Sequence, residues 1–455
     1  MVAKKMVFLG GGSLYFTRAI SDIVIEKELD GSEIVIYDID KEKAGLMANL
    51  GKRLMREAKT SFKIRSAGTL EDAVDGADFA ISSIGGSGAE ITRNVYSSYY
   101  HGADMSISAK YGIQQVVGDT CGPAGMMMGL RTIPVYLKIC KELEKRCPNV
   151  IFFNHSNPMA VICRAMNKYT NINFYGICHG VQEGFGDIAG ILGVSPEELQ
   201  CTWIGTNHYY WFTRILHNGK DMYPELMKRM AKTSPDKNSA MTAKLSQIYG
   251  YKIVYPVDDH VIEFYPFSSQ YQRQDDLPYN LAANAKHHGF DANKLMKKKE
   301  EPSKELRGEF LAKYQEILNK TTLSKKEGNS FSGEGLASLI NAIAAGKRQT
   351  CIINIPNNGL IPNLPKTALV EVEGVTDFKG ARGIYSGECP LHLKGILEKR
   401  FVWQEFVADA AVKGDRNLAL QALLLDEMAI IPEKAELMLE ELLNASKDLL
   451  PQFFK

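Results

Sequence analysis

The sequence predicts an α/β protein in which a Rossmann-type, doubly wound parallel sheet is followed by a second, α+β domain. Three observations support this. Over residues 1–195, short apolar β-branched runs alternate with helical patterns, a glycine cluster directly follows the first run, and the alternation stops after Ser195. Strands that alternate with helices are typical of a parallel sheet with helices on both faces.

Apolar periodicity places the elements of the first domain. Continuous apolar runs indicate buried strands, and an apolar spacing near 3.6 residues indicates helices. We expect strands at residues 7–9, 34–37, 79–82, 150–153 and 174–177. We expect amphipathic helices at residues 14–25, 42–58 and 126–145.

Residues 196–455 are expected to form the second domain, resembling the C-terminal domain of lactate and malate dehydrogenases. Residues 202–216 alternate aromatic and polar side chains and predict one strand, which Asn218-Gly219 follows as a hairpin-turn signal. One further strand is expected at 349–355. We expect helices at 333–345 and from 392 to the C-terminus, and an exposed helix end or loop at the charged run 297–302.

The composition argues against nucleic acid or a membrane as the partner of this protein. The 455 residues are 45% hydrophobic and carry a net charge of +1, so no summed field would steer the protein to nucleic acid or to an anionic membrane. The first residues leave no room for a signal peptide, and we find no apolar stretch long enough to span a membrane. Eight cysteines without a CxxC pair suit reduced thiols. We therefore expect a cytoplasmic protein with a small-molecule ligand.

The glycine cluster predicts a dinucleotide site. Gly10, Gly12 and Ser13 follow the first strand and open a helix, so the backbone can approach a pyrophosphate that the helix N-terminus faces. Asp38 ends the second strand, where a carboxylate binds both ribose hydroxyls and repels a 2′-phosphate, which favours NAD over NADP. Asp38 could instead cap the following helix, although Asp40 suits that role better.

Two other strand ends are expected to face the same cofactor. Ile84 and Gly85 begin a glycine-rich turn, residues 84–88, after the strand at 79–82. Asn154 follows the strand at 150–153. Because ligands bind at the carboxyl edge of such sheets, we expect all three residues to contact NAD. A purely structural turn is the alternative for residues 84–88.

Cys178 and His208 are the candidate metal ligands. Cys178 lies just past a predicted strand, and His208 lies in the aromatic strand at the start of the second domain. A thiolate with an imidazole suits a divalent transition metal and leaves positions open for substrate oxygens. A buried core thiol and a hydrogen-bonded core histidine are the alternative interpretation.

Two polar loops are the candidate substrate contacts. Asn157 belongs to the polar run that follows the strand at 150–153, and Asp119 lies in the loop 117–123 ahead of a helix. Short polar side chains at the carboxyl edge of the sheet can bind sugar hydroxyls. Asn157 could instead cap the helix that begins near Met159.

Taken together, these motifs resemble glycoside hydrolase family 4, the NAD- and manganese-dependent glycosidases. The resemblance covers nearly the whole chain and implies that Cys178 and His208 bind the metal, that Asn157 contacts sugar hydroxyls, and that His179 lies beside the scissile bond. It also implies a homodimer or homotetramer. The matching motifs are the glycine start, Val117-Gly118-Asp119-Thr120 with Gly122-Pro123, Asn157-Pro158-Met159, Cys178-His179-Gly180, Gly205 with Asn207-His208, and residues 354–359.

The residue after the metal cysteine bears on the substrate. In this family the 6-phosphoglycosidases usually have Asp or Asn there, whereas this chain has His179. The resemblance therefore implies an unphosphorylated α-hexoside, an α-galactoside or α-glucoside. An α-glucuronide or α-galacturonide is the alternative, because the motif does not decide between them, and a 6-phospho-α-glycoside is the less favoured one.

The implied chemistry departs from the two-carboxylate route of ordinary glycosidases. NAD would oxidise C3 transiently, the metal would assist loss of the C2 proton, the C1 leaving group would be eliminated, and water and hydride would then be added. Asp258 is our first candidate for the base, with Asp259 and Tyr255 as alternatives. His179 could protonate the leaving oxygen or only bind the sugar.

Two other classes of protein share the predicted sheet and glycine loop. An NAD-dependent 2-hydroxy-acid dehydrogenase would need a His/Asp pair with an arginine clamp and would have no use for the Cys178 thiol. A non-catalytic, NAD-bound sensor would depend on neither metal nor thiol state.

Overall fold

The computed structural model describes residues 3–86, 98–232, 234–288, 303–324, 335–428 and 430–455. The charged run 297–302 and residues 87–88 of the second glycine-rich turn lie outside the described residues, so the expectations for them stay predictions. The same holds for residues 333–334, the expected start of a helix.

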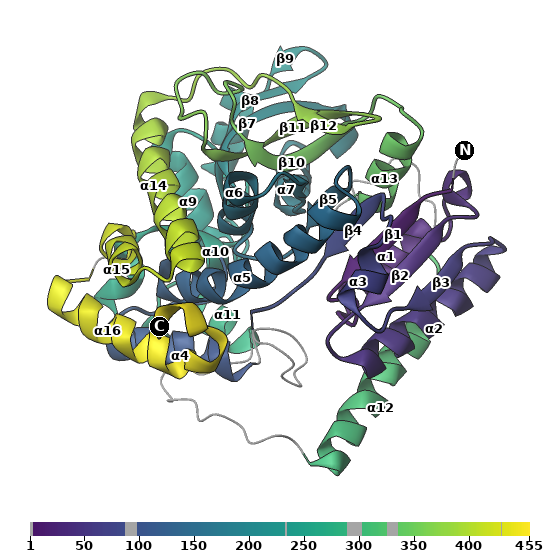
Figure 1. Cartoon of the computed structure of the whole chain (residues 1–455). Coiled ribbons are helices and arrows are strands. Elements are labelled where there is room, and N and C mark those ends of the chain that lie inside the picture. The colour runs from purple at the N-terminus through teal and green to yellow at the C-terminus, as the bar shows by residue number, and fades with distance from the viewer. Residues whose placement is uncertain (1–2, 87–97, 233, 289–302, 325–334, 429) are drawn as a thin grey trace.

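Within these residues a nine-stranded sheet runs through the molecule in the order β12-β11-β10-β6-β5-β4-β1-β2-β3 (Figure 1). Strands β1 to β6 are parallel, and β10 to β12 extend the sheet beyond β6 as antiparallel strands. The strands are β1 (Lys5–Leu9), β2 (Glu33–Tyr37), β3 (Lys63–Ser66), β4 (Phe79–Ser82), β5 (Ile151–Asn154), β6 (Asn173–Gly176), β10 (Thr350–Pro356), β11 (Leu369–Asp377) and β12 (Gly380–Gly383).

The five strands expected in the first domain are confirmed, but the count of strands was too low. The sequence Lys-Ile-Arg-Ser of β3 has a single apolar residue, Ile64, so no apolar run marks it. The strand expected at 349–355 is confirmed as β10, but the expectation of one strand there is wrong, since β11 and β12 follow it. Strand β11 has Glu371 and Glu373 among its valines, which concealed a strand whose first four residues are all buried.

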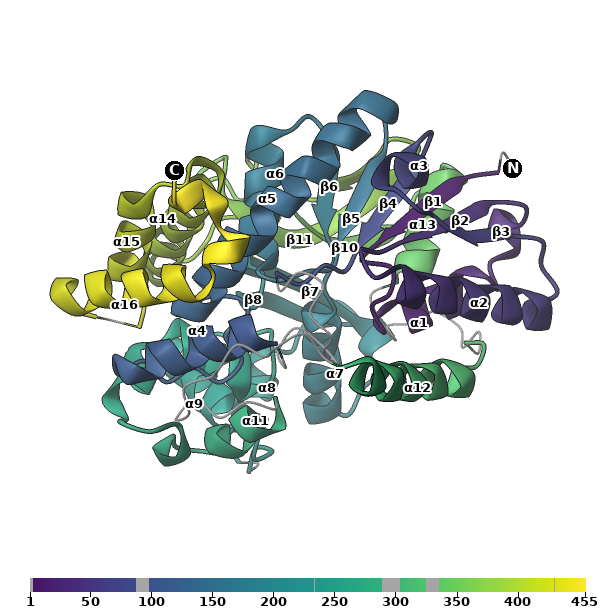
Figure 2. The same cartoon turned by 60° about the horizontal axis from the view of Figure 1, so that its bottom comes forward.

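Helices cover both faces of this sheet, as a doubly wound fold requires. In Figure 2, α3, α5 and α6 lie on one face and α1, α2 and α7 on the other. The three helices expected from periodicity correspond to α1, α2 and α5, and α5 begins four residues earlier than expected. The helices are α1 (Phe16–Ile23), α2 (Lys41–Ala58), α3 (Leu70–Val74), α5 (Gly122–Arg146), α6 (Met159–Tyr169) and α7 (Gly180–Leu192).

A smaller antiparallel sheet consists of β7 (Leu199–Thr206), β8 (Tyr209–His217) and β9 (Lys220–Asp221). The single strand expected at 202–216 is therefore wrong, because the chain reverses between Thr206 and Tyr209. His208 lies in that turn with a left-handed φ of 64°, not in a strand. The turn predicted at Asn218-Gly219 is confirmed and joins β8 to β9.

The remaining helices surround the two sheets. Helix α13 and the three helices after residue 390 confirm the helices expected there, and α12 lies alongside α2 (Figure 2). The division at residue 195 stays a prediction, and β10 to β12, which follow it, join the first sheet. These helices are α4 (Tyr99–Lys110), α8 (Tyr223–Met230), α9 (Ala240–Tyr249), α10 (Asp258–Val261), α11 (Leu281–His287), α12 (Lys304–Lys320), α13 (Leu336–Ala344), α14 (Leu391–Lys413), α15 (Arg416–Leu425) and α16 (Pro432–Ala445).

The expected lack of membrane-spanning segments and the expected free thiols both bear on the described helices and cysteines. Among the described residues, none of the helices has the length and apolar character that crossing a membrane requires. All eight cysteines are free thiols, and seven of them are buried. The thiol of the candidate ligand Cys178 is therefore not consumed by a disulfide.

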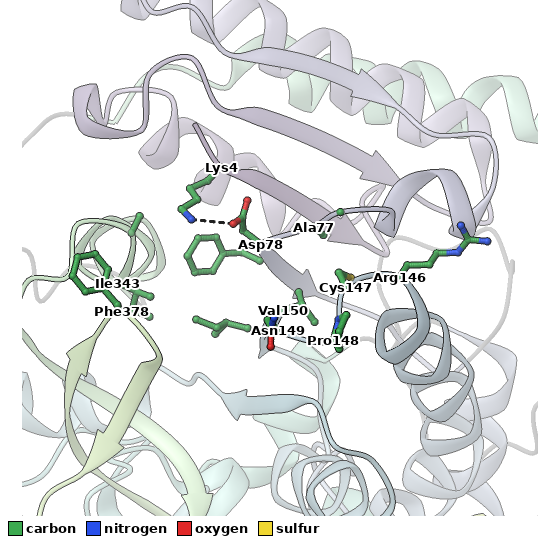
Figure 3. A pocket seen from close by; sticks show the side chains of 14 residues that line it. Lys4, Ala77, Asp78, Arg146, Cys147, Pro148, Asn149, Val150, Ile343 and Phe378 are labelled. Atoms are coloured by element: carbon green, nitrogen blue, oxygen red, sulfur yellow. Dashed lines mark hydrogen bonds and ion pairs between the residues drawn. The ribbon is translucent and has the colours of Figure 1, made fainter. Parts of the chain in front are cut away.

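A pocket of about 320 Å³ lies at the amino ends of the parallel strands (Figure 3). Lys4, Asp78 and Val150 line it, and each of them precedes a strand of the sheet. Lys4 and Asp78 form an ion pair at 2.9 Å across its wall. The predicted cofactor residues and Cys178 follow strands of this sheet or, in the case of Asn154, end one, so this pocket lies at the opposite edge from them.

A buried ion pair joins α4 to α5. Arg131 donates to both carboxylate oxygens of Asp104, at 2.6 and 3.1 Å, and the two side chains are 1% and 0% exposed. Arg131 also donates from Nε to the carbonyl of Gly86 at 2.9 Å. Helix α5 thereby fixes the turn that follows β4, at the edge where a cofactor is expected.

Substitution of Asp104 by alanine should destabilise the protein by about 3–5 kcal/mol, because it leaves the Arg131 guanidinium buried without its counter-charge. Denaturant unfolding of the two proteins measures this difference. The exposed pair between Lys320 and Glu316 provides the control, since Lys320→Ala should leave the unfolding curve almost unchanged. Equal, small effects of both substitutions would contradict the assigned role of Arg131.

Candidate active site and metal centre

The glycine loop is held at the carboxyl edge of the sheet by contacts that only glycine allows. Gly10 has a φ of 71°, and a Cβ atom there would lie 2.3 Å from the carbonyl oxygen of Ser83. The hydroxyl of Ser13, in the loop ahead of α1, lies 3.1 Å from that of Ser83. The loop after β1 is therefore joined to the end of β4.

Asp38 lies directly beside this loop. Its carboxylate accepts hydrogen bonds from the backbone N–H of Gly12 at 2.9 Å and of Asp40 at 2.8 Å. The cap of α2 is Asp40, which accepts from the N–H of Lys43, so the alternative role for Asp38 is not borne out. From α12, Tyr314 donates its hydroxyl to the carbonyl of Gly12 at 2.8 Å, a contact that no sequence pattern indicated.

Ile84, Gly85 and Asn154 lie at the same edge in different environments. The N–H of Ile84 donates to the hydroxyl of Ser156 at 2.7 Å, and Gly85 is exposed. The amide of Asn154 is fully buried, and its oxygen accepts hydrogen bonds from Tyr136 and from the N–H of Ser156. A contact between Asn154 and NAD stays a prediction, and its side chain serves to hold the ends of β4 and β5 together.

The structure brings the two predicted metal ligands together. Sγ of Cys178, just past β6, lies 3.4 Å from Nε2 of His208 in the turn between β7 and β8. Such ligand atoms lie about 2.0–2.3 Å from a bound transition metal, so a separation of 3.4 Å suits two ligands of one ion. Thirty residues of chain separate the two side chains, and the fold places them as one donor set.

The hydrogen bonds of His208 fix which ring nitrogen is free. Thr120 donates its hydroxyl proton to Asp119 at 2.6 Å, and the same hydroxyl lies 3.1 Å from Nδ1 of His208. The Thr120 oxygen therefore accepts the proton of Nδ1, which leaves Nε2 with a lone pair directed at Cys178. A metal-binding imidazole is commonly oriented by a bond of this kind from its other nitrogen.

Burial keeps both ligands neutral without an ion. Desolvation and the neighbouring His260 hold the pKa of His208 well below its usual value, so the imidazole carries no proton on Nε2. Burial, with the nearby charge of Glu371, raises the pKa of Cys178 to about 12. A divalent cation bound here would stabilise the thiolate and release its proton.

Asp119 and Asn157 complete the polar wall of this centre. The Asn157 amide donates to the Asp119 carboxylate at 2.7 Å, so its side chain does not cap α6. Asp119 is 1% exposed, and its other oxygen lies 3.5 Å from Nδ1 of His260. Asp119, His208 and His260 could themselves hold an ion, since their ligand atoms lie within 4.8 Å of one another. The sequence did not indicate His260, because its position beside Asp119 and His208 depends on segments that the fold brings together.

A buried glutamate holds the loop that carries Asp119. Oε1 of Glu263 accepts hydrogen bonds from the backbone N–H groups of Val116, Val117 and Gly118 at 2.7, 2.9 and 2.9 Å. Glu263 is fully buried in a short 3-10 helix, residues 262–264, directly after α10. One carboxylate thus ties the segment 258–263 to the loop before α5.

The three candidate bases have different surroundings. The ring of Tyr255 lies 4.9 Å from that of His208 and 5.0 Å from that of His260, and a Cβ atom on Gly180 would strike it. Asp259 is partly buried, with a carboxylate oxygen 3.3 Å from Nε2 of His288. Burial favours the neutral acid, but His288 and His260 outweigh it and lower the pKa of Asp259.

Asp258 points to a different part of the structure. Its two carboxylate oxygens accept hydrogen bonds from the backbone N–H groups of Met241 and Thr242, at 3.0 and 2.7 Å, at the start of α9. Free N–H groups at a helix N-terminus favour a carboxylate there. This geometry is that of a carboxylate capping the N-terminus of α9, and a role as base stays a prediction for Asp258.

His179 begins α7 and faces a pocket. Its ring is 48% exposed, and Nε2 lies 3.4 Å from a carboxylate oxygen of Glu183. The pocket has a volume of about 460 Å³ and lies between α1 and α7, with Tyr15 and Arg18 on its other wall. His179 thus directly follows the buried Cys178 and lines open space large enough for a sugar-sized group.

Comparisons with known proteins agree with these features. Residues 5–194 match the family described as family 4 glycosyl hydrolase, and residues 203–429 match its C-terminal domain. An α-galactosidase of Bacillus subtilis is 28% identical over 98% of this chain and 97% of its own length. An α-galacturonidase of Lachnoclostridium phytofermentans is also 28% identical, again over 98% and 97% of the two chains.

Solved structures share the fold. A 6-phospho-α-glucosidase from gut microorganisms, in complex with NAD and Mn²⁺, has a TM-score of 0.77 at 21% identity and covers 99% of this chain and 100% of its own. A lactate dehydrogenase of Eimeria maxima, with NADH and oxamate, has a TM-score of 0.51 at 15% identity and covers 91% and 96%. The expected fold class, a Rossmann-type sheet with a dehydrogenase-like second domain, is confirmed.

Removing the Glu263 carboxylate should release the loop that carries Asp119. Glu263→Ala orphans three buried N–H donors, each of which costs about 1–3 kcal/mol. Glu263→Gln retains an acceptor oxygen and should lose far less stability. Chemical denaturation of the two variants measures the difference, and equal losses would show that the hydrogen bonds to the loop contribute little.

The same carboxyl predicts a pH dependence. Burial, against the three N–H donors, raises the pKa of Glu263 from 4.5 to about 8. Folding therefore favours the protonated acid between these values, and the stability contributed by Glu263 falls as the pH rises from 4.5 to 8. The wild type should lose melting temperature relative to Glu263→Gln across that range, whereas parallel curves would contradict the raised pKa.

Proposed function

We propose a substrate and a mechanism for this chain, which belongs to family 4 of the glycosyl hydrolases. It hydrolyses an unphosphorylated α-hexoside, an α-galactoside or α-glucoside, with NAD and a divalent metal, manganese in the first instance. The observation that carries the proposal is the 3.4 Å approach of Cys178 and His208 at the edge where the glycine loop lies. A redox cofactor site and a soft metal site share one edge of the sheet.

The chain's own residues suit both groups. Gly10, Gly12 and Asp38 would hold the dinucleotide, and Cys178 with Nε2 of His208 would hold the ion. The related fold solved with NAD and Mn²⁺ supports this pairing. When bound, NAD supplies reversible oxidation of the sugar at C3, and the metal supplies Lewis-acid stabilisation of the charge that develops as C2 loses its proton.

Tyr255 is the base that the geometry favours for removal of the C2 proton. Its ring is adjacent to His208 and His260, within the centre where the sugar hydroxyls would bind. Burial raises the pKa of Tyr255 well above 10 and so disfavours the phenolate, which the positive charge of an ion held by Cys178 and His208 would favour. Asp259, whose pKa is lowered, is the second candidate.

Asp119 and Asn157 would orient the sugar, and His179 would act at the leaving group. The Asp119–Asn157 pair presents one carboxylate and one amide to the centre, a combination that binds neighbouring hydroxyls. His179 is exposed and adjoins the pocket between α1 and α7, so its imidazole can pass a proton to an oxygen departing into that pocket.

The relatives support two substrate classes. The α-galactosidase and the α-galacturonidase are equally similar to this chain, at 28% identity. We therefore retain an α-glucuronide or α-galacturonide as the second candidate substrate, and a 6-phospho-α-glycoside, the substrate class of the solved 6-phospho-α-glucosidase, as the third. We also propose a cytoplasmic location, in keeping with the free thiols. We further propose a homodimer or homotetramer.

Hydrolysis of a nitrophenyl α-hexoside in deuterated water, with NAD, Mn²⁺ and a reductant, tests the proposal. The route requires exchange at C2, so the recovered sugar should carry deuterium there, as mass spectrometry and NMR can show. Parallel reactions with α-uronides and a 6-phospho-α-glucoside identify the substrate. Turnover without deuterium at C2 would exclude elimination, and steady accumulation of NADH would indicate a dehydrogenase instead.

A further inference from the structure

A buried carboxyl lies behind the candidate metal ligands, Cys178 and His208, on a strand that the sequence did not indicate. Glu371 of β11 is 0% exposed. Its partner in strand register is Asn354 of β10, which in turn pairs with Gly176 of β6, two residues before Cys178. The antiparallel extension of the sheet thus brings one carboxyl close to the end of β6.

The Glu371 carboxylate is connected to the candidate ligand His208 through the side-chain amide of the preceding residue. Asn207 donates from Nδ2 to Oε2 of Glu371 at 3.0 Å. Asn207 is 1% exposed and immediately precedes His208, in a turn where His208 adopts a φ of 64°. A non-glycine residue in the left-handed region persists where its surroundings hold it, and here the hydrogen bond to Glu371 fixes the residue next to it.

The same amide also acts on the second ligand. Burial raises the pKa of Cys178 to about 12, and a hydrogen bond from the side chain of Asn207 acts in the opposite direction, in favour of the thiolate. Asn207 is hydrogen-bonded to Glu371 on β11 and adjoins His208 by a peptide bond. Its side chain thus links β11 to the turn that carries His208.

Glu371 lies at this position at a cost in stability. Among the residues that the structure describes, Oε1 of Glu371 and Oδ1 of Asn207 have no hydrogen-bond partner, and Glu371 takes part in no ion pair. A buried carboxyl without a cationic partner destabilises a fold. A dication bound between Cys178 and His208 would provide the missing positive charge.

We infer that Glu371 and Asn207 are positioning residues of the metal centre. Glu371 holds the Asn207 amide, that amide fixes the turn that carries His208, and the carboxylate contributes negative charge toward the ion. This inference rests on the proposed function, because it takes Cys178 and His208 as the ligands. Groups behind the ligands typically change metal affinity by about 10–100-fold when removed.

Titration of the NAD-bound protein with Mn²⁺, followed by the EPR signal of free Mn²⁺ without substrate, tests the inference. Glu371→Gln removes the charge with little change in shape, and Asn207→Ala removes the amide. The matched control is Thr376→Val, which removes a buried hydrogen-bonding group from the same strand, where Thr376 donates to the carbonyl of Lys347 at 2.7 Å.

Glu371→Gln and Asn207→Ala should each weaken Mn²⁺ binding by about 10–100-fold, while Thr376→Val stays within about twofold of the parent. NAD binding, measured by calorimetry, should not change in any of them. Where Glu371→Gln does not fold, Asn207→Ala tests the other partner of the same hydrogen bond. Lower melting temperatures with unchanged Mn²⁺ affinity would show a structural role only and overturn the inference.

Cys178→Ser separates this inference from the proposed function. It should abolish Mn²⁺ binding while NAD still binds. If Cys178→Ser binds Mn²⁺ as tightly as the parent, the metal site itself is wrong and the proposed function fails with it. If Cys178→Ser loses Mn²⁺ while both Glu371→Gln and Asn207→Ala retain parental affinity, only the role of Glu371 and Asn207 is overturned.

Discussion

The approach of the β7–β8 turn to the end of β6 is the contact on which the site depends. It places His208 against Cys178 and joins the smaller sheet to the carboxyl edge of the larger one, where parallel strands direct their ends. Thr120 then sets the tautomer of His208, and Glu263 holds the loop on which Thr120 lies. On the proposed function, this one contact is what would let a dehydrogenase-like fold bind a metal beside its cofactor edge.

Among the described residues, the ionisable groups around this contact are buried without a positive charge beside them. Burial keeps the thiol of Cys178 and the imidazole of His208 neutral, and it raises the pKa of Glu371 to about 7. The shifts of Cys178 and Glu371 disfavour negative charges that a bound dication would favour, and the neutral imidazole of His208 is the form that can bind a metal. A site of this kind costs stability when empty and recovers it when an ion binds, so metal binding and stability should be linked.

Much of the site could be predicted because it follows strands. Glycine loops, Asp38 and Cys178 come directly after buried apolar runs, so chain order alone puts them on one edge. The contributions of His260, Glu263 and Glu371 could not be predicted, since each depends on contacts with segments distant in sequence. Asp258 shows the reverse: a carboxylate in a suggestive motif whose hydrogen bonds go to the N-terminus of α9.

The most direct test of the central claim is a crystal of the protein grown with NAD and Mn²⁺, with anomalous diffraction data collected at the manganese edge. The account predicts one strong anomalous peak between Sγ of Cys178 and Nε2 of His208. A peak held by Asp119, His208 and His260, away from the thiol, would contradict it, as would a fully occupied NAD site with no manganese at Cys178.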